Sequence, residues 1–148
     1  MSVSRLSVAA LAALALLSLG ACSRDNGLTL SAPDAYAQVQ AGTLTLIDVR
    51  TSDEWRQTGV AQGALRINMA NTQGEAGFVR QVDAALGGDR NASIGLIGLA
   101  GSRATHAQEV LRASGFTHVY TIKEGMLGSS AGPGWIAHKL PVEPCPRC

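Results

Sequence analysis

The chain has 148 residues, with 12 basic and 11 acidic side chains and 4% aromatic residues. This length has room for one domain and a targeting segment but not for two domains. A nearly neutral chain with few aromatic residues lacks the basic surface that nucleic-acid-binding proteins use, so we expect no nucleic-acid partner.

Residues 1–21 predict a secretory signal peptide. Arg5 is followed by a nearly unbroken apolar run from Leu6 to Leu19, and small residues precede Cys22. A short positive region, an apolar core of roughly 14 residues and small residues before a cleavage point are typical of such a peptide. The run is shorter than the roughly 20 apolar residues that a spanning helix needs. Removal of this segment also removes Arg5, so the mature chain keeps as many basic as acidic side chains.

The residues before Cys22 indicate how the mature chain is anchored. Leu19-Gly20-Ala21-Cys22 resembles the bacterial lipobox, in which the cysteine is lipidated and becomes the new N-terminus. The resemblance implies acylation of Cys22, a lipid membrane as partner, and residues 22–27 as a tether. The alternative is ordinary cleavage nearby. Ser23 follows the cysteine in place of an aspartate, which by resemblance to the sorting rule of enteric bacteria favours the outer membrane, facing the periplasm.

Capping patterns and apolar periodicity predict alternating strands and helices in the first part of the domain. Ser31 precedes an acid by three residues, and Thr51 does the same with Glu54, so each is expected to cap a helix. The expected elements are a strand at 28–30, a helix from 32 to near Gly42 with Tyr36 and Val39 facing inward, a strand at 44–49, a helix from 52 to Gly59, a strand at 65–68, and a helix with Phe78, Val82 and Leu86 on one face that stops at Gly87.

The second part of the domain continues the alternation. The expected elements are an apolar strand that includes Ile94, Leu96 and Ile97, a turn at 98–103, a helix with Ala104, Ala107 and Leu111 on one face that ends at Ser114-Gly115, a strand at 118–122, and a short helix around 135–138. Strands that alternate with helices predict one α/β domain, with a parallel sheet of about five strands and helices on both faces.

The turn Gly98-Leu99-Ala100-Gly101-Ser102-Arg103 is the candidate functional site. A turn between a buried strand and a helix directs backbone N–H groups and a helix N-terminus toward one point, which attracts anions. Arg103 either helps to bind a small anion such as sulfate, thiosulfate or phosphate, or forms a salt bridge on the helix surface. Ser102 is expected to cap the helix, because no histidine–aspartate pair is evident that would activate it.

Three stretches of the chain together resemble rhodanese-like domains. The first signature is carried by Leu46-Ile47-Asp48-Val49-Arg50, Glu54-Trp55, Gly59, Gly63-Ala64 and Asn68; the second half by Gly101, Arg103, Leu111 and Gly115-Phe116; the closing segment by Gly125, Trp135 and Leu140-Pro141-Val142. The resemblance covers residues 28–142. It implies a small α/β sulfurtransferase fold.

Enzymes of this family carry a sulfane sulfur as a persulfide on a loop cysteine, which must act as a nucleophilic thiolate. Alignment of Gly101 and Arg103 with the family's loop places Gly98 at that cysteine, and Leu99 and Ala100 are apolar there. We therefore assign no catalytic residue. Asp48 and Arg50 are expected to support the loop through hydrogen bonds rather than to catalyse.

Residues 143–148 form a tail with a Cys-X-X-Cys spacing at Cys145 and Cys148. In an oxidising compartment two such thiols can form a disulfide, and we expect either a plain disulfide or a mobile thiol pair. The alternatives are a redox-active or persulfide-carrying tail, and metal capture through intermolecular pairing. His106, His118 and His138 lack the spacing of a metal site, so we expect no metal or cofactor.

Two functional hypotheses follow, from different classes. The first is a lipid-anchored envelope module that binds a small oxyanion or a protein partner and has no conventional sulfurtransferase activity. The second is a sulfurtransferase, or a sulfur or redox carrier, in which Cys145 or Cys148 replaces the missing loop cysteine. It requires the tail to fold over Gly98. A purely structural envelope protein is a third possibility, which predicts neither a ligand nor thiol chemistry.

Overall fold

The computed structural model of the chain describes residues 28–148. The predicted signal peptide at 1–21, the tether at 22–27 and the acylation site Cys22 lie outside the described residues. Within the described residues, no helix combines the length and hydropathy needed to cross a membrane.

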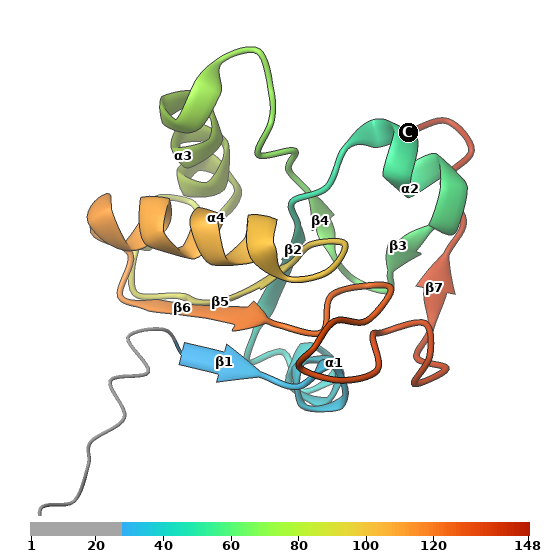
Figure 1. The fold of residues 1–148 in the computed structure, drawn as a ribbon. Helices are drawn as coiled ribbons and strands as arrows, with labels where there is room; N and C mark the ends of the chain where they lie inside the picture. The colour runs from blue at the N-terminus through green and yellow to red at the C-terminus, as the bar shows by residue number, and fades with distance from the viewer. Residues whose placement is uncertain (1–27) are drawn as a thin grey trace, which may run out of the picture.

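A five-stranded parallel sheet forms the centre of the domain, in the order β1-β6-β5-β2-β4 (Figure 1). Asp48 pairs with Ile97 on one side and with Arg66 on the other, so the carboxyl ends of β5, β2 and β4 lie at one edge. The predicted α/β class and parallel sheet are therefore confirmed. The strands of this sheet are β1 (Leu28–Leu30), β2 (Thr45–Asp48), β4 (Leu65–Arg66), β5 (Ser93–Ile97) and β6 (His118–Ile122).

Four helices flank the sheet, with α3 and α4 on one face and α1 on the other (Figure 1). Both faces of the central strands are consequently largely buried, which explains why these strands are rich in apolar residues. The capping box predicted at Thr51 and Glu54 is confirmed at the start of α2. The helices are α1 (Ala32–Gln40), α2 (Ser52–Thr58), α3 (Gly74–Ala85) and α4 (Ser102–Ala113).

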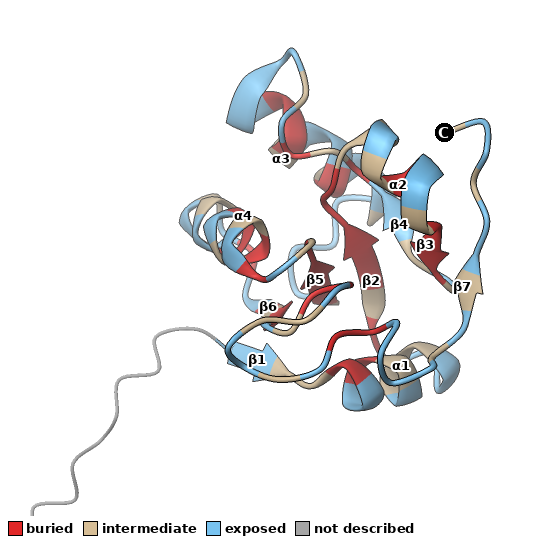
Figure 2. Cartoon of the chain, turned by 45° about the vertical axis from the view of Figure 1, so that its right-hand side comes forward, coloured by how far each residue is buried: buried red, intermediate tan, exposed pale blue. Residues whose placement is uncertain are grey.

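Two apolar clusters fill the space between the sheet and its helices, and Figure 2 shows the buried residues along the inner sides of the helices. Phe78 of α3 and Leu111 of α4 belong to the first cluster, and Ala32 and Ala35 of α1 to the second. The predicted inward residues Phe78, Val82, Ala104, Ala107 and Leu111 are buried. Leu86, Tyr36 and Val39 are only partly buried, and the buried residues of α1 are Ala32 and Ala35.

A small second sheet was not expected from the sequence. It consists of β3 (Val60–Ala61) and β7 (Val142–Glu143), which pair antiparallel. It docks the closing segment onto the domain, and Gln62 N donates to Pro141 O at 3.0 Å. Two residues are too few to show the alternation of a strand, and neither Val60–Ala61 nor Val142–Glu143 was expected as one.

The short helix predicted around 135–138 is wrong, because that segment forms turns. Lys139 has a φ of 56°, in the left-handed region, and this stops helical propagation. Trp135 is nevertheless fully buried, and its Nε1 donates to Pro141 O at 2.9 Å.

Candidate functional site

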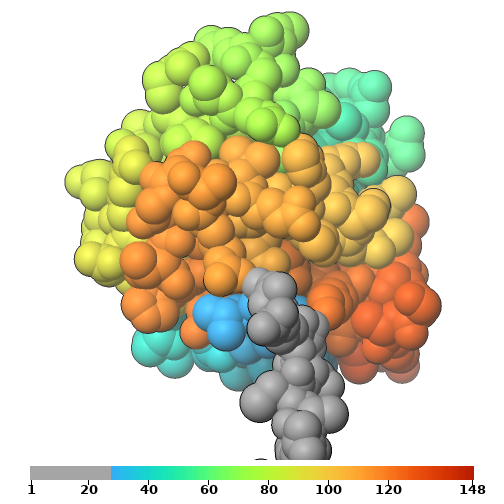
Figure 3. Space-filling model, turned by 60° about the vertical axis from the view of Figure 1, so that its left-hand side comes forward, coloured from blue at the N-terminus to red at the C-terminus, as the bar shows by residue number. Residues whose placement is uncertain are grey.

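The turn that joins β5 to α4 lies at the carboxyl edge of the sheet, which is where ligands bind in open α/β folds. The segment that follows β6 holds this turn in place. Met126 N donates to Gly98 O at 2.9 Å and Leu127 N donates to Leu99 O at 3.0 Å. Figure 3 shows this orange-red segment packed beside the gold start of α4.

Gly101 is the N-cap residue of α4 and has a φ of 97°. A Cβ at this position would lie 2.4 Å from Lys123 O, so both the backbone angle and the close approach require glycine. The expectation that Ser102 caps α4 is wrong. Ser102 is the first residue of the helix, and no side-chain hydrogen bond caps this end.

Gly98 differs from Gly101 because its environment accepts a side chain. Its φ lies outside the left-handed region, and an added Cβ would find Ala104 N at 3.5 Å as its nearest neighbour, which is ordinary van der Waals contact. A side chain at position 98 would therefore lie against the first turn of α4. No steric or backbone constraint imposes glycine there.

The backbone N–H groups of residues 99–104 line the turn; Leu99, Ala100, Ser102 and Arg103 are at least partly exposed, whereas Gly101 and Ala104 are buried. Within residues 28–148, none of them donates to an intramolecular acceptor, and the first main-chain bond of this end runs from Thr105 N to Gly101 O at 3.0 Å. α4 has 12 residues, so its dipole places partial positive charge at the same point. The arrangement favours a small anion.

Arg103 is held by Glu54 of α2. Arg103 Nη1 lies 2.6 Å from Glu54 Oε2, and Nη2 lies 3.3 Å from Oε1. Partial burial acts to raise the pKa of Glu54, but hydrogen bonds from Arg103 and Thr51 outweigh it and lower the pKa from 4.5 to about 2. Glu54 is thus ionised at neutral pH and neutralises Arg103.

Asp48 and Arg50 form a fully buried ion pair at the end of β2. Arg50 donates from Nη2 to Asp48 Oδ2 at 2.7 Å and from Nε to Oδ1 at 3.0 Å. It also reaches the end of α2, where Thr58 Oγ1 is 2.7 Å and Gly59 O 2.8 Å away. These contacts join β2 to α2. Both charges of the pair are compensated, so neither side chain is free to act on a substrate.

Arg103 also borders a cavity of about 340 Å³ between the first turns of α3 and α4. His106 contributes to its wall, and its Nε2 lies 2.7 Å from Glu75 Oε1. Met69 and Asn71 are also among its lining residues. This cavity lies next to the loop and has an apolar wall as well as a polar one.

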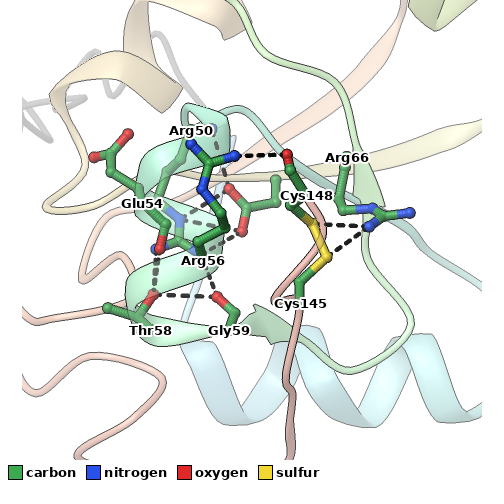
Figure 4. The surroundings of a disulfide bond; sticks show 9 residues. Arg50, Glu54, Arg56, Thr58, Gly59, Arg66, Cys145 and Cys148 are labelled. Carbon is green, nitrogen blue, oxygen red and sulfur yellow. Dashed lines mark hydrogen bonds and ion pairs between the residues drawn. A yellow bond between two sulfur atoms is a disulfide. The ribbon is translucent and has the colours of Figure 1, made fainter.

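The tail cysteines form a disulfide with each other, Cys145–Cys148. Their contacts are with Arg56 of α2 and Arg66 of β4, and not with residues 98–103 (Figure 4). The structure therefore does not bring the tail onto the Gly98 loop, as a replacement nucleophile would require.

His106 and His118 have different neighbours in the fold. His106 contacts Glu75, and His118 Nδ1 lies 2.8 Å from Thr117 Oγ1. In residues 28–148, no three histidine, cysteine, aspartate or glutamate side chains gather in a way that could hold a metal ion.

Sequence reasoning missed the two arginines at the disulfide, Arg56 and Arg66. Nothing near them in the sequence distinguishes them, because their partners lie 92 and 79 residues further along the chain. The Thr51 capping box pointed to one role of Glu54, but its bond to Arg103 spans 49 residues and leaves no local signal.

A parallel sheet with a glycine-containing turn between β5 and the start of α4 defines an open α/β domain. A model of the Rhodanese-like domain family matches residues 31–131. The chain belongs to the rhodanese-like family. The match lies within the predicted domain limits of 28–142.

Solved structures resemble this fold. The Rhodanese-like domain of an Anabaena sp. protein is 22% identical, with a TM-score of 0.62 and 80% of each chain covered. A polysulfide-sulfur transferase homodimer from Wolinella succinogenes is 25% identical, with a TM-score of 0.61, and 80% of this chain and 79% of that chain are covered. A thiosulfate sulfurtransferase from Pseudomonas aeruginosa is 21% identical with a TM-score of 0.61, and the match covers 80% of this chain but 20% of that one. No curated protein sequence matches the chain.

Proposed function

We propose that the chain is a rhodanese-like binding module whose loop 98–103 holds a small oxyanion and that it has no conventional sulfurtransferase activity. The observation that carries the proposal is Gly98. It stands where the family's loop cysteine is expected, in a loop that still offers room and N–H groups at that point.

Sulfur transfer of the usual kind needs a thiolate at the loop to form the persulfide. Residues 98–103 contain no cysteine. The sulfurs of Cys145 and Cys148 are bonded to each other and contact Arg66. An oxyanion held by the loop would therefore meet no nucleophile.

The affinity for an oxyanion is expected to be modest. The N–H groups of residues 99–104 and the dipole of α4 attract it, whereas the charge of Arg103 is matched by Glu54. A dissociation constant of about 1 mM corresponds to about 4 kcal/mol, which a few hydrogen bonds to an anion can supply.

The test is titration of the protein with thiosulfate and with sulfate, followed by backbone amide NMR shifts. We expect saturable shifts at residues 99–104. Gly98→Asp should abolish them, because its carboxylate would occupy the anion's place, whereas the isosteric and neutral Gly98→Asn should retain them. Absence of shifts in the wild-type protein at high thiosulfate would contradict the oxyanion assignment and favour a protein partner.

The loss of sulfurtransferase activity needs its own assay. We expect no thiosulfate-to-cyanide transfer by the wild-type protein, and none by Cys145→Ser/Cys148→Ser. Turnover that disappears with the two serines would contradict the proposal and establish the alternative, a carrier that uses the tail thiols.

We further propose that the protein is anchored in the bacterial envelope through acylated Cys22 and faces the periplasm, with the outer membrane favoured. The proposal rests on the lipobox resemblance of Leu19-Gly20-Ala21-Cys22. Metabolic labelling with a fatty-acid analogue should mark the wild-type protein and not Cys22→Ser. Equal labelling of both proteins, or release of the wild-type protein as a soluble species, would contradict it.

A further inference from the structure

The tail disulfide is docked on the domain by β7. This strand pairs with β3 through Val60 and Glu143, and the disulfide follows directly. Gly59 permits the close approach, because a Cβ there would lie 2.5 Å from Val142 Cγ1 and 2.8 Å from Glu143 O. The sulfur pair consequently has defined neighbours rather than lying at a free end.

Arg66 contacts both sulfurs of the disulfide. Its Nη1 lies 2.7 Å from Cys145 Sγ and 2.8 Å from Cys148 Sγ, as Figure 4 shows. Arg56 adds a second guanidinium, which donates to the main-chain oxygen of Cys148 at 2.8 Å and also pairs with Asp53. Two guanidinium groups from separate elements thus contact the tail, but only that of Arg66 contacts the sulfurs.

The partners of Arg66 set it apart from other arginines of the domain. Arg50, Arg56, Arg90 and Arg103 each form an ion pair with a carboxylate. Within the described residues, Arg66 makes no such pair and directs its guanidinium at the two sulfurs instead. Its charge is therefore not neutralised by a neighbouring acid.

A disulfide sulfur is a neutral and weak acceptor, whereas a thiolate is an anion. Arg66 therefore stabilises the reduced pair more than the oxidised pair. Stabilisation of the reduced form makes a disulfide a better oxidant. The geometry points to a thiol–disulfide exchange site in which the Cys145–Cys148 disulfide accepts two electrons from a dithiol, with Arg66 as the positioning residue that stabilises the thiolate.

The exchange proceeds in two displacements. A thiolate of the donor dithiol attacks one sulfur of the pair; the Cys145–Cys148 bond breaks, and its electron pair stays on the other sulfur as a thiolate beside Arg66. The donor's second thiol loses its proton to solvent and attacks the mixed disulfide. The donor leaves as a disulfide, and the second cysteine takes a proton from solvent, so the chain ends with one thiol and one thiolate.

The donor can reach the pair, because both cysteines are partly exposed. A cavity of about 280 Å³ extends from Cys145 between the end of α2 and the tail, with Arg56, Thr58 and Pro144 in its lining. This activity uses a different part of the molecule from the loop 98–103 and does not depend on oxyanion binding there.

The experiment uses the 148-residue chain with Cys22→Ser, purified in detergent, so that Cys145 and Cys148 are the reactive thiols. The protein is equilibrated in mixtures of reduced and oxidised glutathione, and free thiols are counted with an alkylating mass tag. Arg66→Met should shift the equilibrium about threefold to tenfold toward the disulfide, the effect of losing ~0.5–1 pKa unit of thiolate stabilisation. Arg66→Lys should stay close to the wild-type equilibrium, because it keeps the positive charge.

Two further measurements separate this role from a structural one. The alkylation rate of the reduced pair against pH should move to higher pH in Arg66→Met and not in Arg80→Met, an arginine of α3 whose hydrogen bond goes to Gln73. The oxidised protein should oxidise a reduced dithiol peptide stoichiometrically, and Cys145→Ser/Cys148→Ser should not. An unchanged glutathione equilibrium and pH profile in Arg66→Met, with folding intact by circular dichroism, would overturn the proposal, as would failure of the wild-type pair to exchange with the peptide.

Discussion

Arg103 of α4 and Glu54 of α2 form an ion pair, with Nη1 2.6 Å from Oε2. The same carboxylate oxygen accepts from Thr51 N at 2.8 Å and from Thr51 Oγ1 at 2.9 Å. One carboxylate thus caps α2 and neutralises the cation beside the N-terminus of α4. The attraction of the loop 98–103 for anions therefore depends on its N–H groups rather than on a guanidinium.

Replacement of Glu54 by glutamine should strengthen oxyanion binding at the loop. The substitution leaves Arg103 with an uncompensated charge, which we expect to raise the affinity for thiosulfate about threefold to tenfold. The affinity is measured by amide NMR titration. The double variant Glu54→Gln/Arg103→Gln serves as the control and should return to the wild-type affinity. Equal affinities of the single and double variants would exclude Arg103 as the cause.

Glu54 should also give the stability a characteristic pH dependence. Its folded-state pKa is lowered from 4.5 to about 2, so it contributes stability above pH 4.5 that is lost as the pH falls toward 2. Urea unfolding should show that the wild-type protein is more stable than Glu54→Gln at pH 6. The difference in their free energies of unfolding should become smaller as the pH falls from 4.5 toward 2. Glu109→Gln, at a side chain that is 72% exposed, should follow the wild-type curve. A constant difference between wild type and Glu54→Gln would contradict the assignment.

A cysteine introduced at position 98 should restore a reactive thiol to the loop. The backbone there accepts a side chain, whose Cβ would lie 3.5 Å from Ala104 N at the start of α4. A helix N-terminus lowers a thiol pKa, so Gly98→Cys should take up sulfur from thiosulfate as a persulfide. Peptide mass spectrometry detects this as the added mass of one sulfur atom. Gly98→Ser is the control. A loop cysteine that stays unmodified while the fold is intact would show that Leu99 and Ala100 have also removed substrate binding.

The two glycines of the loop should respond oppositely to alanine. Gly101→Ala places a Cβ 2.4 Å from Lys123 O at a φ of 97°, and should lower the free energy of unfolding by at least about 2 kcal/mol. Gly98→Ala meets neither constraint and should change it by less than about 1 kcal/mol. Urea denaturation of the two variants compares them directly. Similar losses of stability at both positions would contradict the claim that the fold requires glycine at position 101 but not at position 98.

Rupture of the Asp48–Arg50 pair should cost much more than rupture of an exposed pair. Arg50→Met leaves Asp48 buried without its partner, and we expect a loss of about 3–5 kcal/mol in the free energy of unfolding. Asp48→Asn/Arg50→Met should lose less than the sum of the single variants, because the uncompensated charge is removed. Asp83→Asn, which breaks the exposed pair with Arg90, should cost about 1 kcal/mol or less. If the losses in free energy of unfolding of the two single variants simply add in the double variant, Asp48 and Arg50 are not directly coupled.

Local patterns predicted most of the elements because each depends on residues close in sequence. The capping box of Thr51 and Glu54 has a separation of three residues, and the apolar face of α4 repeats within 12 residues. The pairs Arg103–Glu54 and Arg66–Cys145 span 49 and 79 residues. No periodicity records such distances, so these contacts could not be predicted from the sequence.

The error at Ser102 has a similar cause. A serine before an apolar helix is an ordinary cap, and the sequence favoured it. The turn instead reaches Lys123 O so closely that position 101 must be glycine with a positive φ, and this glycine takes the cap position. A tertiary contact therefore overrode a local preference.

The sequence by itself determined the family and class of fold, the position of the loop 98–103 and the absence of a cysteine within it, because strand, turn and helix signals are local and a residue's identity needs no structure. Only the tertiary structure decided that Glu54 neutralises Arg103, and that Cys145 and Cys148 lie against Arg66 rather than over Gly98. The physical reason is that charge pairing acts between side chains that are near in space, and parallel crossovers bring together residues that are far apart in the chain.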